Sequence, residues 1–338
     1  MPLTLTRTAK MTKTGIVFFG LIFLVLASAY TAYQIYYYQY YLPNKPAPIQ
    51  KPEEKFSALP APSFITSAVS SSNYSYTLAT VTGGLPTVPK NVKVYFIPQL
   101  GTTLLASDKA KSLASSFGFN NGPKVLSQTQ FEFDDDTNGK MTINLDTSNF
   151  KFARVASTSA TLSDSLPDQS KLASDFKDYL SSLGLMSDNL KNGRTKVVYN
   201  QADSQTSQTA SISIWPADFD KLPLVTPTFS DGLVKAVINK STDDVLKYQS
   251  LSYTYWSPDP NNGSTYPIKT PDQALADLKS GKGSIVIEPQ NPQVAITSVY
   301  LAYFESDQYS LYLLPIYVFE GQGFVAYVNA ISDEAVGK

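Results

Sequence analysis

The stretch YSLYLLPIYVFEG, residues 309–321, is apolar on both of its alternate faces. Successive side chains of a β-strand point to opposite faces, so this pattern is typical of a strand that is buried on each side or that presents an aromatic face to a partner. The runs VAITSVYLAYFE (294–305) and GFVAYVNAI (323–331) flank it across the turns SDQ and GQG. We predict a C-terminal β-meander, with Pro315 at an edge or a bulge because proline has no N–H to donate to a neighbouring strand.

If the aromatic face of this meander is exposed, it supplies an interaction surface. The residues that would form that surface are Tyr303, Tyr312, Tyr317 and Phe319.

Three helices are expected upstream of the meander. In SDKAKSLASSFGF (107–119), apolar residues recur at helical spacing, Ser107 is a candidate N-cap and Gly118 a candidate terminator. A second helix is expected within 167–185 and ends at Gly184, where YLSSLGL (179–185) repeats LASSFGF (113–119). A third begins at Thr270, with Pro271 and Gln273 completing a capping box.

Strand-like runs separate and follow these helices, at 92–97, 150–156, 195–200, 209–215, 233–239 and 248–256. Many strands with few helices predict an α+β fold of antiparallel sheets, each packed by a short helix, with an internal helix-plus-strands repeat.

The composition excludes several kinds of chemistry. The chain of 338 residues has no Cys and no His, which removes thiol nucleophiles, disulfides, imidazole bases and the usual zinc ligands. No complete catalytic or cofactor-binding motif is present. Outside the first residues there is a slight excess of acidic residues, so the sequence has no nucleic-acid-binding footprint.

The run IVFFGLIFLVLASAYTAYQI (16–35) has no charge, and about 20 apolar residues in a helix cross the hydrocarbon layer of a bilayer. Arg7, Lys10 and Lys13 precede it and Lys45 is the next charge, so the positive-inside rule places the N-terminus in the cytoplasm and the rest outside. We therefore predict a single-span cell-membrane protein. The alternative is a signal peptide that is cleaved after Ala29.

Tyrosines crowd the outer end of this run, where an amphipathic ring can rest at the headgroups. The predicted membrane-interface residues are Tyr30, Tyr33, Tyr36, Tyr37 and Tyr40.

The proline-rich segment 42–63 predicts an extended stalk of polyproline type. The expected organisation is a cytoplasmic tail (1–14), a transmembrane helix (15–38), a stalk (39–68), a first α+β module (69–157) and a second module or modules (158–338) that end in the meander.

FEFDDDTNGKMTINLD (131–146) contains the densest acidic cluster. Asp134, Asp136 and Asn138 match the opening of a calcium-binding loop, but position 12 of an EF-hand loop would be Leu145, and the flanks alternate like strands. The stretch favours a hairpin with positive φ at Asn138 and Gly139, and a weak calcium site of another kind remains the alternative.

Three carboxylates lie near the ends of the C-terminal strands: Glu305, Asp307 and Glu320. Such residues could form the acid pair of a glycan-cleaving enzyme, or could be charged strand ends that face water.

The segment TPDQALADLKSGKG (270–283), followed by the three strands of the meander, resembles PepSY-like modules and the extracytoplasmic domains of the YycH/YycI regulators. Only about the last 70 residues carry this resemblance. It implies a bacterial regulator or inhibitor that binds a sensor kinase or a peptidase and has no catalytic activity.

These observations predict a membrane-anchored cell-envelope protein that regulates through contacts with another envelope protein. Two alternatives stay open at this stage, a carboxylate-dependent enzyme acting on envelope glycan or peptidoglycan, and a surface-layer or adhesion subunit.

Overall fold

The computed structural model describes residues 5–41, 51–64, 69–99, 101–155 and 161–337, without the side chains of 5–12, 40 and 41. The chain forms two compact units, Met1–Lys51 and Pro52–Lys338. The predicted α+β class is confirmed: one N-terminal apolar helix is followed by two multi-stranded sheets. The expected boundary at residues 157 and 158 lies outside the described residues.

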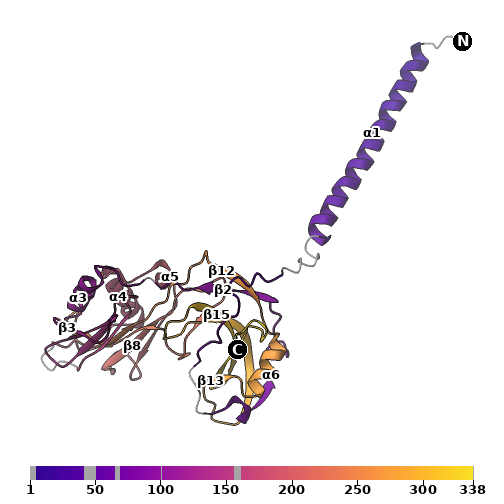
Figure 1. Ribbon diagram of the computed structural model, residues 1–338. Coiled ribbons are helices and arrows are strands. Elements are labelled where there is room, and N and C mark those ends of the chain that lie inside the picture. The colour runs from indigo at the N-terminus through magenta and orange to yellow at the C-terminus, as the bar shows by residue number, and fades with distance from the viewer. Residues whose placement is uncertain (1–4, 42–50, 65–68, 100, 156–160, 338) are drawn as a thin grey trace. The chain divides into compact units, whose positions relative to one another are not determined.

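The first unit is the helix α1 (Leu5–Tyr36), extended by a π-helical turn η1 (Tyr37–Tyr41) (Figure 1). Lys13–Gln39 is long and apolar enough to cross a membrane and is not buried against the protein, although a signal sequence has the same properties. Its hydroxyls bond within the helix: Ser28 donates to the carbonyl of Leu24, and Thr31 to that of Ala27. A segment in hydrocarbon needs such internal pairing, since no water is present there.

The second unit contains all the strands. In chain order its elements are η2 (Ser71–Asn73), β1 (Ser75–Leu78), β2 (Asn91–Phe96), α3 (Ala106–Ser116), β3 (Asn121–Val125), β4 (Gln130–Asp134), β5 (Lys140–Asn144), β6 (Phe150–Ala153), α4 (Gln169–Ser182), α5 (Asp188–Lys191), β7 (Thr195–Tyr199), β8 (Thr209–Ile214), β9 (Leu224–Val225), β10 (Val234–Asn239), β11 (Tyr248–Tyr253), β12 (Gly263–Pro267), α6 (Pro271–Lys279), β13 (Ser284–Ile287), β14 (Gln293–Phe304), β15 (Tyr312–Gly321) and β16 (Phe324–Asn329).

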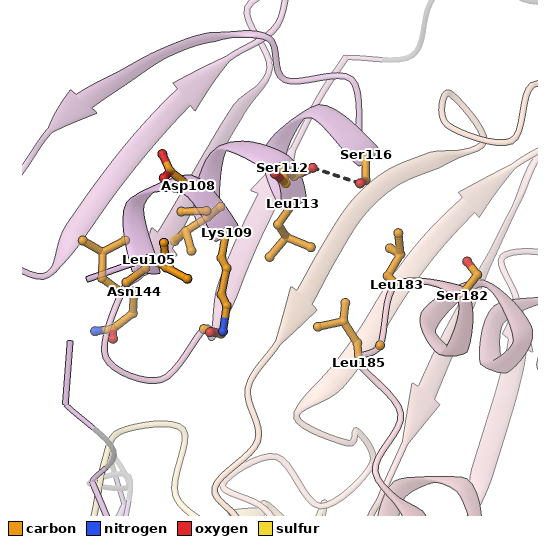
Figure 2. A pocket seen from close by; sticks show the side chains of 16 residues that line it. Leu105, Asp108, Lys109, Ser112, Leu113, Ser116, Asn144, Ser182, Leu183 and Leu185 are labelled. Carbon is orange, nitrogen blue, oxygen red and sulfur yellow. Dashed lines mark hydrogen bonds between the residues drawn. The ribbon is translucent and has the colours of Figure 1, made fainter. Parts of the chain in front are cut away.

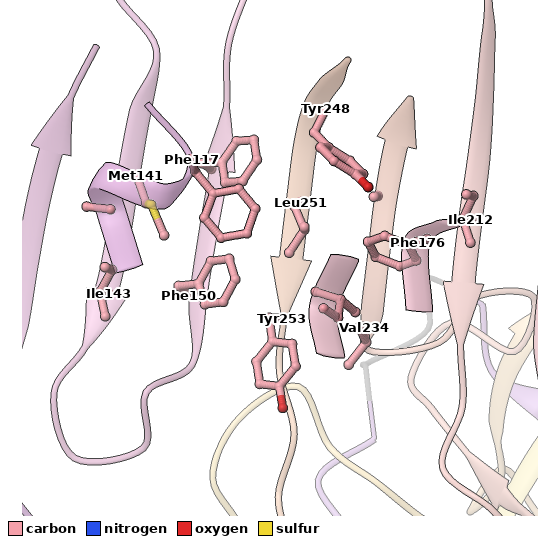
Figure 3. Packing of buried hydrophobic residues seen from close by; sticks show 14 of the residues in the cluster. Phe117, Met141, Ile143, Phe150, Phe176, Ile212, Val234, Tyr248, Leu251 and Tyr253 are labelled. Carbon is pink, nitrogen blue, oxygen red and sulfur yellow. The ribbon is translucent and has the colours of Figure 1, made fainter. Parts of the chain in front are cut away.

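The first sheet has eight antiparallel strands in the order β3-β4-β5-β6-β11-β10-β8-β7. Its strands alternate between buried and more exposed residues, and the buried side chains form one core with those of α3 and α4 (Figure 3). Phe176 of α4 is fully buried in this core and packs against Tyr248 of β11. Both helices therefore belong to one face of the sheet.

This sheet contains the predicted internal repeat. Each helix, α3 or α4, is followed by a four-stranded meander, and the two meanders join through their last strands, β6 and β11. The helix ends match closely: Gly118 and Gly184 have φ of 79° and 70°, and each donates its N–H to the third residue before it. A left-handed conformation at this point favours glycine, which explains why both copies carry it.

The second sheet contains the path β1-β14-β15-β16-β13, together with β2, β9 and β12. The predicted meander is confirmed as β14, β15 and β16, which pair antiparallel. β15 is buried on both faces: Tyr317 and Phe319 join the core that includes α6, whereas Ile316 and Val318 join a smaller core on the other side.

Pro315 lies inside β15 at the point where the strand changes partner. On the side away from β14, Tyr312 and Leu313 pair with β2, and pairing with β16 begins at Ile316. The missing N–H of Pro315 therefore falls between two partner strands, where the loss of a donor costs little.

The predicted helix starts are confirmed in one case and wrong in another. Thr270 caps α6 with a complete capping box, and Pro271 occupies its first turn. α3 begins at Ala106 rather than after Ser107, and its N-cap position is Leu105, which makes no side-chain capping bond.

Residues 52–64, part of the segment expected as a stalk, pack onto the second unit and are called the strap below. The backbone N–H of Glu53 donates to the carbonyl of Thr265 at 3.1 Å, and that of Leu59 to the carbonyl of Ala335 at 2.9 Å. Leu59 is fully buried and belongs to a core with residues of β2, β12 and β15. Residues 42–50 and 65–68 of the expected stalk lie outside the described residues.

Aromatic side chains fix the strap further. The ring of Phe56 stacks on Tyr266 with centroids 6.4 Å apart and lies 5.0 Å from the ring of Tyr312. Phe64 contacts Phe304 edge to face at 5.2 Å. The strap is therefore part of the folded body.

We expect Leu59→Ala to lower the free energy of unfolding by about 2–5 kcal/mol, because it empties a fully buried site. Urea unfolding of the full chain in neutral detergent, followed by tryptophan fluorescence, measures this. The control is Leu104→Ala, since Leu104 is 103% exposed and its truncation should change stability by less than about 0.5 kcal/mol. Equal effects of the two substitutions would show that the strap adds nothing to stability.

Candidate functional site

Glu305 directly follows β14 and is the most unusual titratable group of the second unit. The residue is 2% exposed, and neither carboxyl oxygen has a hydrogen-bond partner of normal geometry. Its backbone N–H donates to the carbonyl of Val225 at 2.9 Å, and the indole N–H of Trp256 donates to the carbonyl of Ser306 at 2.7 Å. The carboxyl is thus enclosed where β14, β9 and the end of β11 meet.

Burial raises the pKa of the Glu305 carboxyl to about 8, because the charged form loses its hydration. The backbone N–H of Trp256 opposes this shift. No ion pair of Glu305 is found among the described residues. The carboxyl is therefore protonated in the folded protein at neutral pH, and the alternative of a charged strand end facing water is wrong for Glu305.

The three carboxylates that could have supplied a catalytic pair, Glu305, Asp307 and Glu320, do not form one shared site. Glu320 is a partner of Ser298 across β14 and β15, and Ser298 precedes Glu305 by seven residues along one strand. At about 3.3 Å per residue, this separates Glu305 and Glu320 by roughly 23 Å. Asp307 is exposed, whereas Glu305 is enclosed. An acid and a base must flank one bond, so Glu305 and Glu320 cannot act as such a pair.

The acidic stretch forms the predicted hairpin, since β4 pairs with β5. Asn138 has a φ of 64°, as expected, whereas the expected positive φ at Gly139 is wrong. The loop has five residues and closes with a bond from the N–H of Asp135 to the carbonyl of Gly139. Asp134 belongs to β4, and Asp136 accepts a bond from the Asn121 amide at 3.1 Å.

Asp135, rather than the three residues predicted to bind calcium, organises this loop. Its Oδ1 accepts bonds from the backbone N–H groups of Thr137 and Gly139 at 2.8 and 2.6 Å, and its Oδ2 lies 4.0 Å from the buried Arg154 guanidinium. The Arg154 guanidinium and two backbone N–H groups therefore already compensate the negative charge of the Asp135 carboxylate. The part of the chain that the structure describes has no cluster of three acidic, His or Cys side chains able to hold a metal. Calcium binding by Asp134, Asp136 and Asn138 stays a prediction.

The predicted aromatic interaction surface is not exposed. Tyr303, Tyr317 and Phe319 are fully buried, and Tyr312 is half-buried beneath the strap. The hydroxyls of Tyr303 and Tyr317 donate to the carbonyls of Lys93 and Lys269. These side chains hold the sheet together, because both faces of the meander are covered.

The tyrosines predicted at the membrane interface lie at the end of α1 and in η1. Tyr30, Tyr33 and Tyr36 are about 60% exposed, and Tyr37 stacks on Tyr33 with centroids 6.0 Å apart. The side chain of Tyr40 lies outside the described residues. Their contact with lipid headgroups stays a prediction.

The sequence did not indicate a groove of about 720 Å³ beside α3 (Figure 2). Leu113 of α3 lies on one side, and Leu183 and Leu185, at the C-terminal end of α4, lie across from it. Leu105 at the start of α3 lines the groove and is 61% exposed, and its neighbour Leu104 is 103% exposed. This part of the surface therefore exposes several leucine side chains.

The polar groups of the groove are mostly neutral. Ser112, Ser116 and Ser182 contribute hydroxyls, and the only charged side chains among the lining residues are Asp108 and Lys109. Ser116 donates to the backbone carbonyl of Ser112 at 2.9 Å. The titratable side chains that line the groove are Asp108 and Lys109.

No protein-family model and no curated protein matches the chain. Among solved structures, it is similar to an uncharacterized protein from Eubacterium rectale, with 13% identity over 71% of this chain and 82% of that chain and a TM-score of 0.29. It is also similar to the Bacillus megaterium YpeB C-terminal domain, with 12% identity over 70% of this chain and 95% of that chain and a TM-score of 0.31. TM-scores of this size do not establish a shared fold, so the resemblance to PepSY-like modules stays a prediction.

Glu305 makes stability depend on pH. Its folded pKa is raised above the unfolded value, so its contribution is complete below about pH 4.5 and is lost as the pH rises through about 8. We expect Glu305→Gln to stabilise the protein at pH 8 by on the order of a few kcal/mol and to flatten the fall in melting temperature between pH 5 and 8.

Thermal melting across this pH range measures the effect. Glu334→Gln at an exposed site is the control and should melt like the unsubstituted chain at each pH. An unchanged slope in Glu305→Gln would mean that the carboxyl is solvated or paired in solution.

Proposed function

We propose that this protein is tethered to the cell membrane by α1, with its N-terminus in the cytoplasm, and that its second unit binds another envelope protein outside without catalysing a reaction. The observation that carries this proposal is the apolar groove beside α3, because it is a site built for contact in a unit whose titratable groups are scattered.

The placement is supported by charge and by bonding within α1. Arg7, Lys10 and Lys13 precede the apolar run without an acidic residue among them. The polar side chains within the run find partners on their own helix, as when the Gln34 amide donates to the Tyr30 hydroxyl at 2.9 Å. The charge bias is shared with a signal peptide, whereas pairing of polar side chains as far as Gln34, beyond Ala29, favours a span in lipid.

Binding is favoured over catalysis by the isolation of the acidic groups. Glu305 is enclosed and about 23 Å from Glu320, and Asp135 is engaged by Arg154 and backbone N–H groups. Glycan cleavage needs two carboxyl groups within about 10 Å of one another and open to substrate. The carboxylates singled out in the sequence do not meet this requirement.

The chemistry of the groove indicates the kind of contact. Leu104 and Leu105 expose apolar surface at its rim, and Leu113, Leu183 and Leu185 line it. Burial of one leucine side chain contributes about 1.5–3 kcal/mol, so a partner that inserts two or three apolar side chains gains enough for a specific contact. A sensor kinase or a peptidase is the partner that the sequence resemblance implies.

The lack of native cysteine allows a direct test of placement. Two single-cysteine variants are made, Thr6→Cys and Ser115→Cys, and Ser115 is exposed on α3. Intact cells that produce each variant are treated with a membrane-impermeant maleimide. We expect labelling of Ser115→Cys alone, and of both variants after lysis. Labelling of Thr6→Cys in intact cells, or loss of the residues before position 30 from the mature protein, would contradict the tethered topology.

The groove is tested by a photoreactive amino acid at Leu105. We expect irradiation of intact cells to link this site to one protein of defined mass, and Leu104→Asp to reduce the product about tenfold or more, because it places a charge in the apolar contact. The control is the same photoreactive residue at Val81, which is fully exposed between β1 and β2. Identical products from both positions, or none from Leu105, would contradict a contact in the groove.

A further inference from the structure

A single row of side chains crosses the first sheet on the face opposite α3 and α4, one residue from each of the eight strands. The register pairs each member with the next, so the row is continuous from edge to edge. In order its members are Lys124, Glu132, Thr142, Lys151, Ser252, Lys235, Ser213 and Lys196, and they are called the lysine row below.

The alternation of the strands places this row on the face away from the core. Neighbours of its members along the strands, such as Met141, Phe152 and Ile212, are buried in the core with α3 and α4. Lys124 is 67% exposed at its side chain and Lys235 48%. Lys151 and Lys196 are exposed as well, so four ammonium groups project from one side of a sheet that carries no helix there.

The row has an excess of positive charge. Glu132 is its only acidic member and lies 3.7 Å from Lys124. Lys235 lies 3.4 Å from Asp231, and Lys196 donates to the backbone carbonyl of Ser230 at 3.5 Å. No ion pair of Lys151 is found among the described residues. This excess is local, because the whole chain has a formal net charge of −1.

On one side of the lysine row the excess of positive charge does not continue. The next row along the strands contains Asp134 beside Lys140, followed by Ala153, Ser250 and Val237, and so has no net charge. Adjacent strands are about 4.8 Å apart, which places Lys235 roughly 10 Å from Lys151 on one side and from Lys196 on the other. The eight strands together span roughly 34 Å.

We propose that the lysine row binds a linear polymer that carries phosphate groups and lies across the strands. A line of point charges fits a linear chain, whereas a lipid surface is planar and would favour positive charge spread in two dimensions. Lysine binds phosphate as a point charge, and the row contains no arginine fork for bidentate carboxylate recognition. The half-buried hydroxyls of Thr142 and Ser252 lie beside Lys151 and can bond to phosphate or sugar oxygens, whereas Ser213 is buried.

This ligand differs from the protein partner proposed above and occupies the other face of the sheet. The inference depends on neither the groove nor the membrane placement, so each can fail without the other. The row has no aromatic side chain on which a base could stack, so we expect recognition of backbone charge without preference for a nucleic acid.

Full-length protein in nonionic detergent is titrated against fluorescently labelled long-chain inorganic polyphosphate at several salt concentrations, with fluorescence anisotropy as the readout. The test variant is Lys151→Gln/Lys196→Gln/Lys235→Gln. We expect at least about tenfold weaker binding at low salt and a slope of log affinity against log salt that is smaller by about 2, since each neutralised phosphate contributes about 0.7.

The matched control is Lys90→Gln/Lys111→Gln/Lys279→Gln, which removes the same charge from exposed sites elsewhere. The control should bind within about twofold of the unsubstituted chain, and both variants should melt at its temperature, because exposed lysines add little stability. Absence of polyphosphate binding, or equal losses in the two variants, would overturn the proposal. Tighter, lysine-row-dependent binding to phosphatidylglycerol vesicles would also overturn it, since the ligand would then be a lipid surface.

Discussion

Two-sided burial of β15 is the constraint on which the second unit depends. Because Tyr317 and Phe319 point into one core and Ile316 and Val318 into another, the strand needs cover on both faces. α6 supplies it on one side, and Phe64 of the strap with β9 supplies much of it on the other. In the sequence β9 lies between β8 and β10 of the first sheet, but it pairs with β14 of the second sheet. The need to cover β15 therefore links the two sheets.

The local elements of this fold could be predicted from sequence, because their signals are local. The capping box at Thr270, the meander after it and the glycines that end α3 and α4 are all fixed by residues within a few positions of one another. The repeat detected between 113–119 and 179–185 also corresponds to equivalent hydrogen bonds in the structure. The start of α3 escaped prediction because Leu105 at its N-cap makes no side-chain bond, so the sequence carried no capping signal there.

The candidate sites depend on pairings between distant segments, and the sequence could not supply these. For Glu305 the sequence allows an acid pair or a solvated strand end, but its environment is made by Val225, which pairs beside it through β9 and β14, and by Trp256. The groove needs α3 beside the end of α4, and this packing of two helices from distant parts of the chain is not specified by any local pattern. The lysine row is visible only once the register of eight strands is known, since adjacent members are up to about a hundred residues apart in the sequence.

The strap determines how mechanical tension would enter the folded body. Between η1 and the strap the chain spans residues 42–51, which reach at most about 35 Å when fully extended. A pull on the chain ahead of the strap that exceeds this length would load the bond from Glu53 to Thr265 first and the bonds of Leu59 to the C-terminal residues only afterwards. Detachment in this order would lengthen the tether stepwise while β14, β15 and β16 stay intact. Under tension the bonds of Glu53 are therefore expected to break before the buried contacts of Leu59 are lost.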